Sequence, residues 1–320
     1  MKTSTGRMKI TMTTGIFNIN RLSCRGSGWS QLSKSHSMKK LMLLFCCLPL
    51  LLNAQNFHFG LRAGFLGYQG DLKNGMLSQM RFMGAIGAQY DLTEHLSART
   101  YVTYGKLQGD DSKGTPAMRE RNLNFQSKLL DWEVGAQYNF FSLNDRWWTP
   151  YIALGLGLFH FNPYTKDAGG NKVFLQPLST EGQGFVPGIQ PYKRTQFSIP
   201  LAFGGSYSTG EDTRVGIEFG YRKIFTDYLD DVSNAYVDAS ALEGARGTQA
   251  VELAWRSDEV TGQPYPAAGT GRGNPKNKDA YYYIAVTFTI RYWFDKYKQV
   301  AGLPGGRKEK KVGCPASRGY

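Results

Sequence analysis

Three aspartates lie within five residues in the stretch Phe225-Thr226-Asp227-Tyr228-Leu229-Asp230-Asp231-Val232-Ser233. Carboxylate oxygens at such close spacing are the kind of ligand that Ca²⁺ prefers. The spacing does not match an EF-hand loop, and Asp and Ser are also ordinary turn and helix-cap residues. The stretch leaves two interpretations open, a calcium site and a structured turn. We favour the turn and expect neither a metal nor another cofactor.

The residues that carry enzymatic chemistry are sparse and scattered. His58, His95 and His160 are far apart in the sequence, and no Ser/His/acid or Asp/His set is expected to gather around any of them. Of four cysteines only Cys314 follows the N-terminal leader described below, so neither an internal disulfide nor a cysteine-bound zinc site is expected. We therefore predict a protein that is not an enzyme.

Alternating segments dominate the chain after residue 55. The last of them, Tyr281–Phe294, places large apolar residues on one face and smaller or polar residues on the other. Such alternation over about ten residues is typical of a tilted strand that crosses a bilayer. Eight segments have this pattern: Phe57–Tyr68, Phe82–Leu92, Leu96–Leu107, Phe125–Phe140, Thr149–Phe161, Gln196–Tyr207, Thr213–Phe225 and Tyr281–Phe294.

The connections between these segments alternate strictly in length. Three are tight: Thr93-Glu94-His95, Ser142–Trp148 and Ser208–Asp212. Four are long: Gln69–Arg81, Gln108–Asn124, Asn162–Thr195 and Thr226–Ala280. Outer-membrane barrels have short periplasmic turns, longer outer loops and an even number of strands. The sequence therefore predicts an all-β fold, an eight-stranded antiparallel transmembrane barrel of the up-and-down OmpA/OmpX type, in preference to a soluble β-barrel.

Several charges fall at positions that the alternation places inside the barrel. An eight-stranded barrel is just wide enough for side chains to fill it, and an unpaired charge in that space is costly. We expect a salt-bridge core that stabilises the barrel, with an ion pathway as the alternative. The predicted interior charges are Arg62, Arg99, Asp131, Glu133, Arg214, Glu218, Arg222 and Arg291.

The two ends of the chain differ from its middle. Met38-Lys39-Lys40 precedes the apolar run Leu41–Leu52 and the small-residue site Ala54-Gln55, which is typical of a secretory signal cleaved near Ala54/Gln55. We predict that residues 1–37 are an over-long start, 38–55 the signal peptide, 56–295 the barrel and 296–320 a basic periplasmic tail.

The excess of positive charge belongs to these ends. Of 38 basic residues, eight lie in the first 55 positions, which hold no acid, and seven lie after position 295 beside the single acid Glu309. The barrel itself is nearly neutral, so a nucleic-acid partner is not expected. The tail is interpreted either as a solvated end or as a hook for an acidic periplasmic partner, with Cys314 as a further candidate for linkage.

One stretch carries a family resemblance. Tyr221-Arg222-Lys223-Ile224 followed by the aspartate-rich stretch, the later Arg272-Gly273-Asn274 and Thr149-Pro150-Tyr151 resemble the PorG-like outer-membrane barrels of Bacteroidota over roughly 57–294. The Ala54-Gln55 cleavage site is also common in that group. The family-motif residues are Phe225, Thr226, Asp227, Tyr228, Asp230, Asp231, Ser233, Arg272, Gly273 and Asn274.

The resemblance implies a part in the type IX secretion system, as a monomeric barrel that holds a periplasmic ring lipoprotein and its partner against the outer membrane. Residues 296–320 depart from the pattern of barrels that end at the last strand. Two other functions stay open: a surface adhesion or interaction barrel that acts through its outer loops, and a narrow pore.

Overall fold

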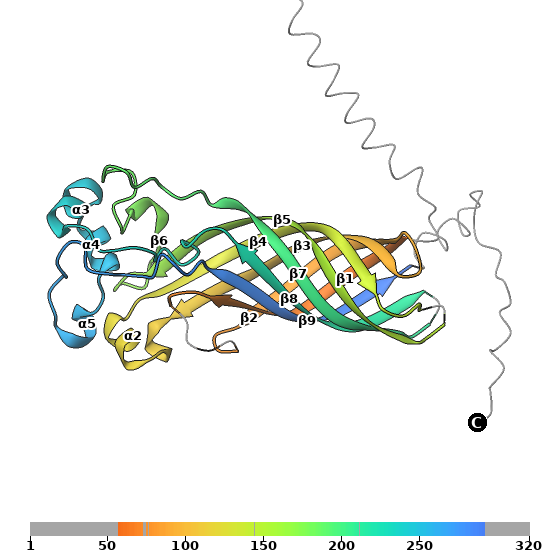
Figure 1. Ribbon diagram of the computed structural model, residues 1–320. Helices are drawn as coiled ribbons and strands as arrows, with labels where there is room; N and C mark the ends of the chain where they lie inside the picture. The colour runs from red at the N-terminus through yellow and green to blue at the C-terminus, as the bar shows by residue number, and fades with distance from the viewer. Residues whose placement is uncertain (1–56, 73–74, 76, 144, 211, 292–320) are drawn as a thin grey trace, which may run out of the picture. The chain divides into compact units, whose positions relative to one another are not determined.

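A closed antiparallel barrel of eight strands makes up most of the described chain (Figure 1). This computed structural model describes residues 57–72, 75, 77–143, 145–210 and 212–291. The barrel strands are β1 (Phe57–Gln69), β2 (Arg81–Asp91), β3 (Leu96–Asp110), β4 (Asn124–Asn139), β5 (Trp148–Lys166), β7 (Thr195–Ser208), β8 (Thr213–Ile224) and β9 (Ala280–Ile290).

Each barrel strand pairs with the next barrel strand in the chain, and one further pairing, between β1 and β9, closes the ring. The sheet order is β4-β3-β2-β1-β9-β8-β7-β5, and β4 also pairs with β5. Closure leaves no open edge among these strands, which is the condition for a β structure in a bilayer. The predicted fold and the number of barrel strands are confirmed.

The end of the last strand was predicted too late. β9 stops at Ile290, which lies opposite Thr213, the first residue of β8. Beyond that pair the neighbouring chain turns away, although the Arg291 amide still donates to the Asp212 carbonyl at 2.8 Å. Residues 292–294 lie outside the described chain, as do the predicted leader, signal peptide, basic tail and Cys314.

The alternation sorts side chains as the sequence predicts. On β5, Ile152, Leu154 and Leu156 are exposed, whereas Tyr151 and Ala153 between them are buried. Exposed apolar side chains cover the barrel wall on every strand, a surface that soluble monomers rarely present. Large aromatic side chains are exposed near the short turns, as in the girdles of membrane barrels: Tyr138, Phe140, Trp147, Trp148 and Tyr207.

No helix in the described chain is both long enough and apolar enough to cross a membrane.

The four long connections lie together at one end of the barrel and contain short helices (Figure 1). These elements are η3 (Asp111–Lys113), α2 (Pro116–Arg121), η4 (Gln176–Leu178), α3 (Ala239–Arg246), α4 (Thr248–Ala254) and α5 (Asp258–Thr261). A short strand, β6 (Lys172–Phe174), pairs with the end of β5. The sequence predicts only loops in these connections. We call the described residues of these four connections the cap.

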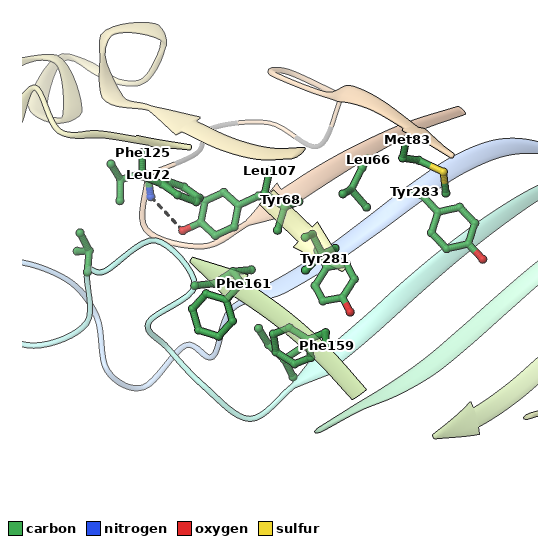
Figure 2. Close-up of a cluster of buried hydrophobic side chains, with 14 of the residues drawn as sticks. Leu66, Tyr68, Leu72, Met83, Leu107, Phe125, Phe159, Phe161, Tyr281 and Tyr283 are labelled. Atoms are coloured by element: carbon green, nitrogen blue, oxygen red, sulfur yellow. Dashed lines mark hydrogen bonds between the residues drawn. The ribbon is translucent and has the colours of Figure 1, made fainter. Parts of the chain in front are cut away.

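An apolar and aromatic layer fills the barrel interior at the cap end. Figure 2 shows side chains from β1, β3, β5 and β9, with Tyr68 among them close to Leu72 of the first long connection. Phe159 and Phe161 stack at 5.6 Å between ring centroids, and Tyr281 meets Phe159 edge-on at the same distance. Burial of so much apolar surface is the main stabilising contribution at this end.

Candidate functional site

Six of the eight predicted interior charges meet in one network in the middle of the barrel. β1 supplies Arg62, β3 supplies Arg99, β4 supplies Asp131 and Glu133, and β8 supplies Glu218 and Arg222. All six side chains are almost fully buried. The network contains three cations and three anions, so it has no formal net charge.

Glu133 is the centre of this network because it contacts all three arginines. Its Oε1 lies 2.9 Å from Arg62 Nη1 and 3.3 Å from Arg99 Nη2. Its Oε2 accepts from Arg222 Nη2. Arg222 also reaches Asp131, with 3.1 Å between Nε and Oδ2.

Glu218 is the second centre and joins the network to interior tyrosines. Its Oε1 lies 3.2 Å from Arg62 Nε, and its Oε2 lies 2.6 Å from Arg99 Nη1. The Tyr151 hydroxyl donates to Oε2 at 2.9 Å, and the Tyr283 hydroxyl donates to Oε1. These contacts supply the additional hydrogen bonds that buried carboxylates need.

Little open space is left around the network. The Arg62 guanidinium lies 3.3 Å from the centroid of the Tyr101 ring. Between the network and the short turns, the interior cavity has a volume of about 20 Å³, which is room for about one water. On the cap side lies the apolar layer of Figure 2.

The remaining two predicted charges lie outside the network. Arg214 forms its own pair with Asp91, 2.8 Å between Nη2 and Oδ2, near the short turns. Arg291 pairs with Asp212 of the β7–β8 turn at 3.1 Å. Both pairs lie where strands end, so they neutralise charge at that end and not in the middle of the barrel.

The aspartates of the family motif accept hydrogen bonds from protein donors at separate places in the cap. Asp227 Oδ2 accepts from Ser233 Oγ at 2.7 Å. Asp230 accepts from the Tyr68 hydroxyl. Asp231 accepts from Thr180 Oγ1 at 2.6 Å and from the Tyr192 hydroxyl at 2.7 Å.

This arrangement favours the structured turn over the calcium site. Among the residues that the structure describes, no group of three His, Cys, Asp or Glu side chains is placed to hold a metal ion. The aspartates instead satisfy hydroxyl and backbone donors that would otherwise be buried without partners.

Arg272 and Glu181 form the centre of the cap, from connections far apart in the sequence. Arg272 Nη1 lies 3.1 Å from Glu181 Oε1 and donates to the Asp231 carbonyl at 2.5 Å. Glu181 also accepts from the Ser233 amide at 2.8 Å and the Asn234 amide at 2.9 Å. The third and fourth long connections are thereby joined by a buried ion pair with further hydrogen bonds.

Arg121 joins the first two long connections to the same centre. Its side chain pairs with Asp111 at 2.7 Å and donates to the carbonyls of Asp71 at 2.7 Å and Arg272 at 2.8 Å. All four connections are therefore linked through buried or half-buried polar groups, which orders the cap at this end of the barrel.

Gly273 and Asn274 lie where this cap is tightest. Asp71 Oδ2 accepts from the Asn274 amide at 2.8 Å. A Cβ on Gly273 would lie 2.5 Å from that oxygen and 2.9 Å from the backbone N and O of Ser233. Of the other motif residues, Phe225 is exposed, Thr226 Oγ1 accepts from the Tyr228 amide at 3.2 Å, and the Tyr228 hydroxyl accepts from Asn234 at 2.7 Å.

Gly273→Ala is expected to destabilise the cap by about 1–3 kcal/mol, because a backbone contact cannot move aside easily. Gly271→Ala is the matched control, since a Cβ there meets nothing within 4 Å. The measurement is hydrogen exchange of the cap amides in the folded barrel. Equal protection in both variants would show that the close approach at Gly273 does not limit stability.

The buried aspartates make the cap sensitive to pH. Burial raises the pKa of Asp231 to about 6, although Arg272, Thr180 and Tyr192 favour its charged form. Burial also raises the pKa of Asp227 to about 6. For Asp279, burial and then the nearby Asp230 carboxylate raise the pKa well above its ordinary value.

The pKa values of Asp231, Asp227 and Asp279 are all raised, so the cap is expected to be more stable in acid than at neutral pH. A raised folded-state pKa means that folding favours the protonated form. The stability it contributes is complete below about pH 3.8 and is lost as the pH rises to about 6. Hydrogen exchange of 227–234, corrected for intrinsic rates, measures this. Asp231→Asn should reduce the slope, and protection that rises with pH would contradict the assignment.

The three histidines of the described residues lie apart, and each contacts a structural partner. His95 Nδ1 lies 2.9 Å from the Asn139 carbonyl oxygen, and His160 Nδ1 lies 2.8 Å from Thr195 Oγ1. His58 is buried with its Nδ1 3.6 Å from Asp91 Oδ2. Ser97 donates to the same aspartate at 2.7 Å, so serine and histidine share an acid without the serine–histidine contact of a catalytic triad.

The partners within the cap and the interior tyrosines were not predicted from the sequence. Tyr101, Tyr151 and Tyr283 occupy inward positions of their strands, so the alternation alone could have found them. Glu181, Asp71 and Arg121 lie in long connections that have no such periodicity. Their roles depend on contacts between residues 50 to 151 positions apart, for which the sequence offers no local signal.

The sequence also matches a family model, the outer membrane protein beta-barrel domain, over residues 41–242. The chain belongs to this family. An outer membrane protein beta-barrel domain is located in the outer membrane, so the exposed apolar wall of this barrel faces lipid. No curated protein matches the sequence significantly.

Three solved structures with a similar fold are distant in sequence. Neisserial surface protein A is 14% identical, with 74% of this chain and 97% of that chain covered and a TM-score of 0.38. OprG from Pseudomonas aeruginosa is 10% identical, with 74% and 97% covered and a TM-score of 0.38. Ail of Yersinia pestis, in complex with a heparin analogue, is 8% identical, with 73% and 99% covered and a TM-score of 0.34. Likeness at this level says nothing about shared function.

Proposed function

We propose that this outer-membrane barrel is a non-enzymatic anchor or assembly component of an envelope complex. The observation that carries the proposal is the filled lumen. Within the described residues, charged groups paired inside the barrel and an apolar layer at the cap end fill the lumen, and the cavity between the network and the short turns is about 20 Å³. A barrel with a filled lumen is expected to act through its two ends.

The resemblance to PorG-like barrels supports the type IX secretion machine of Bacteroidota as the complex. In this proposal a signal peptide is cleaved near Ala54/Gln55 and the long connections face outward. The short turns and the tail 296–320 then face the periplasm, where they contact the ring lipoprotein and its partner. The segment 296–311 contains six basic residues, and this positive charge suits an acidic partner.

A pull-down in mild detergent of the tagged barrel from its native outer membrane tests this proposal. The expected result is recovery of a periplasmic ring lipoprotein, identified by mass spectrometry and lost when 296–320 is removed. Recovery that does not depend on the tail would move the contact to the short turns. A barrel recovered alone would overturn the anchor proposal.

The narrow pore is tested separately in planar bilayers. We expect the purified barrel to be electrically silent, because an ion would have to displace buried, mutually paired charges. Steady unitary currents from the unmodified chain would contradict the filled lumen. Since this test needs no partner, its outcome is independent of the pull-down.

A surface interaction barrel is the second candidate, and the ordered cap favours it. Helices α3 and α4 carry a small apolar cluster of their own, Leu242, Ala250 and Ala254. We call residues 236–270, which contain these helices, the excursion. An isolated β-bridge between Ala235 and Gly271 closes its base, and the Tyr236 amide donates to the Thr270 carbonyl at 2.9 Å.

The excursion can therefore be replaced without breaking the centre of the cap. A short Gly-Ser linker in place of 238–268 should leave the Arg272–Glu181 pair intact. If the outer surface is the functional one, this variant loses binding to an external target while the pull-down result is unchanged. Loss of the periplasmic partner instead would contradict this candidate.

A further inference from the structure

A hollow of about 710 Å³ lies on the outer wall of the barrel, at the cap end of β2, β3 and β4. Its lining combines apolar and cationic residues: Arg81, Phe82, Gly84, Tyr104, Lys106 and Gln126, among others. Neither the filled lumen nor the cap uses this surface. It lies on the wall that faces lipid.

The lower part of the hollow is apolar and exists because one residue has no side chain. Gly84 faces outward between Phe82 and Ile86 and lies directly opposite Tyr104 on β3. A Cβ there would meet only the Arg62 carbonyl oxygen, at 3.9 Å. Phe82 is 67% exposed and Tyr104 is 53% exposed, so the two rings flank an open apolar groove. Such a groove suits a hydrocarbon chain.

Arg81 and Lys106 line the upper part of the hollow, and Lys128 lies beside this lining on β4. Lys106 on β3 and Lys128 on β4 are directly opposite each other and both are exposed. Directly opposite like charges destabilise a sheet. Among the described residues no acidic side chain pairs with either lysine, and Arg81, nearby on β2, donates instead to Gln108 Oε1 at 2.6 Å. An anion between the two lysines would reverse the repulsion.

We propose that this hollow binds a phosphorylated, acylated glycolipid of the outer leaflet. A phosphate lies between Lys106 and Lys128 with Arg81 beside it, and an acyl chain follows the groove over Gly84. The cations stand at the end of the apolar band, the level at which lipid headgroups are found. The inference rests on the outward orientation of the cap in the proposed function and does not depend on any protein partner.

Binding of lipid A to the purified full-length barrel in neutral detergent, measured by native mass spectrometry, tests the proposal. Each cation near a lipid surface changes affinity by about fivefold, so Lys106→Gln with Lys128→Gln should weaken lipid A by about 25-fold. Lys223→Gln is the matched control. Lys223 is also exposed, but its direct neighbours across the sheet are Ile199 and Ala280, so its loss should leave the affinity unchanged.

A second variant tests the acyl groove without altering charge. Gly84→Leu should fill the hollow and weaken lipid A while leaving the folded barrel intact. Without lipid, Lys106→Gln should not lower the unfolding temperature, because it removes a repulsion. The affinity for lipid A and the unfolding temperature together distinguish weaker lipid binding from a destabilised fold.

Three outcomes would overturn the proposal. Equal weakening by Lys223→Gln would mean general attraction to the barrel surface. Equally tight binding of phosphatidylglycerol would remove the assignment to a glycolipid, and equally tight binding of inorganic phosphate would remove the role of the acyl groove. The pull-down result stays the same in each case, so failure here is distinct from failure of the anchor proposal.

Discussion

Replacing Glu133 by leucine is expected to lower the free energy of unfolding by about 3–5 kcal/mol, because it leaves buried cations without their shared partner. Glu133 contacts Arg62, Arg99 and Arg222 and is itself almost fully buried. Leucine fills a similar volume, so the loss of stability is caused by the removed charge and not by a cavity. The measurement is urea unfolding of the barrel in detergent micelles, followed by the shift in its electrophoretic mobility.

Glu259→Gln is the control for this prediction. Glu259 also pairs with an arginine, Arg256, at 2.8 Å, but its side chain is 44% exposed. Solvent-exposed pairs contribute about 0–1 kcal/mol, so this variant should unfold nearly as the parent does. A loss for Glu133→Leu that is no larger than the loss for the control would contradict a stabilising network.

A double variant tests whether the network acts as a unit. Adding Arg222→Leu to Glu133→Leu removes a cation together with its partner, although Asp131 then loses its contact with Arg222. We expect the double variant to be more stable than the sum of the two single losses implies. Strict additivity would mean that Arg222 and Glu133 contribute independently.

Arg272→Leu is expected to open the cap while the barrel stays folded. Arg272 is buried, pairs with Glu181 at 3.1 Å and donates to the Asp231 carbonyl at 2.5 Å. Without it Glu181 remains a buried carboxylate with only amide donors, at a cost of about 3–5 kcal/mol. The cap should then be cut by chymotrypsin within 227–279 under conditions in which the strands resist.

Arg246→Gln is the control on the same surface. Arg246 is exposed on α3, and its Nε donates to Ser179 Oγ at 3.2 Å, a contact in which neither group is a buried charge. We expect cleavage like that of the parent chain. If Arg272→Leu leaves the cap resistant, the apolar layer and not the ion pair determines its order. Unfolding of the whole barrel would show that the cap and the strands form one cooperative unit.

The amino-acid sequence by itself determined the barrel. Alternation is a property of neighbouring residues, so the faces of a strand can be read locally, as the exposed Leu154 and buried Ala153 show. The strict alternation of short and long connections then set the number and direction of the strands. The same parity placed Arg62, Glu133 and Glu218 inside.

Which interior charges meet was decided by the register of the closed sheet. Arg214 and Arg222 lie on the same face of the same strand, yet Arg222 reaches Glu133 and Arg214 reaches Asp91. Arg222 lies in the middle of the barrel, and Arg214, eight residues away on β8, lies near its end. Only the closure of the sheet specifies which side chain faces each of them across the lumen.

The cap was decided entirely by tertiary structure. Long connections have no periodicity, so the sequence left a calcium site open for the aspartates at 227–231 beside the favoured turn. The pairing of Arg272 with Glu181, 91 residues away, and the contact of Arg121 with Asp71, 50 residues away, could not be predicted from local sequence. Most buried polar groups find a donor or acceptor, and for Glu181 and Arg272 in this cap those partners come from other connections, which no local pattern specifies.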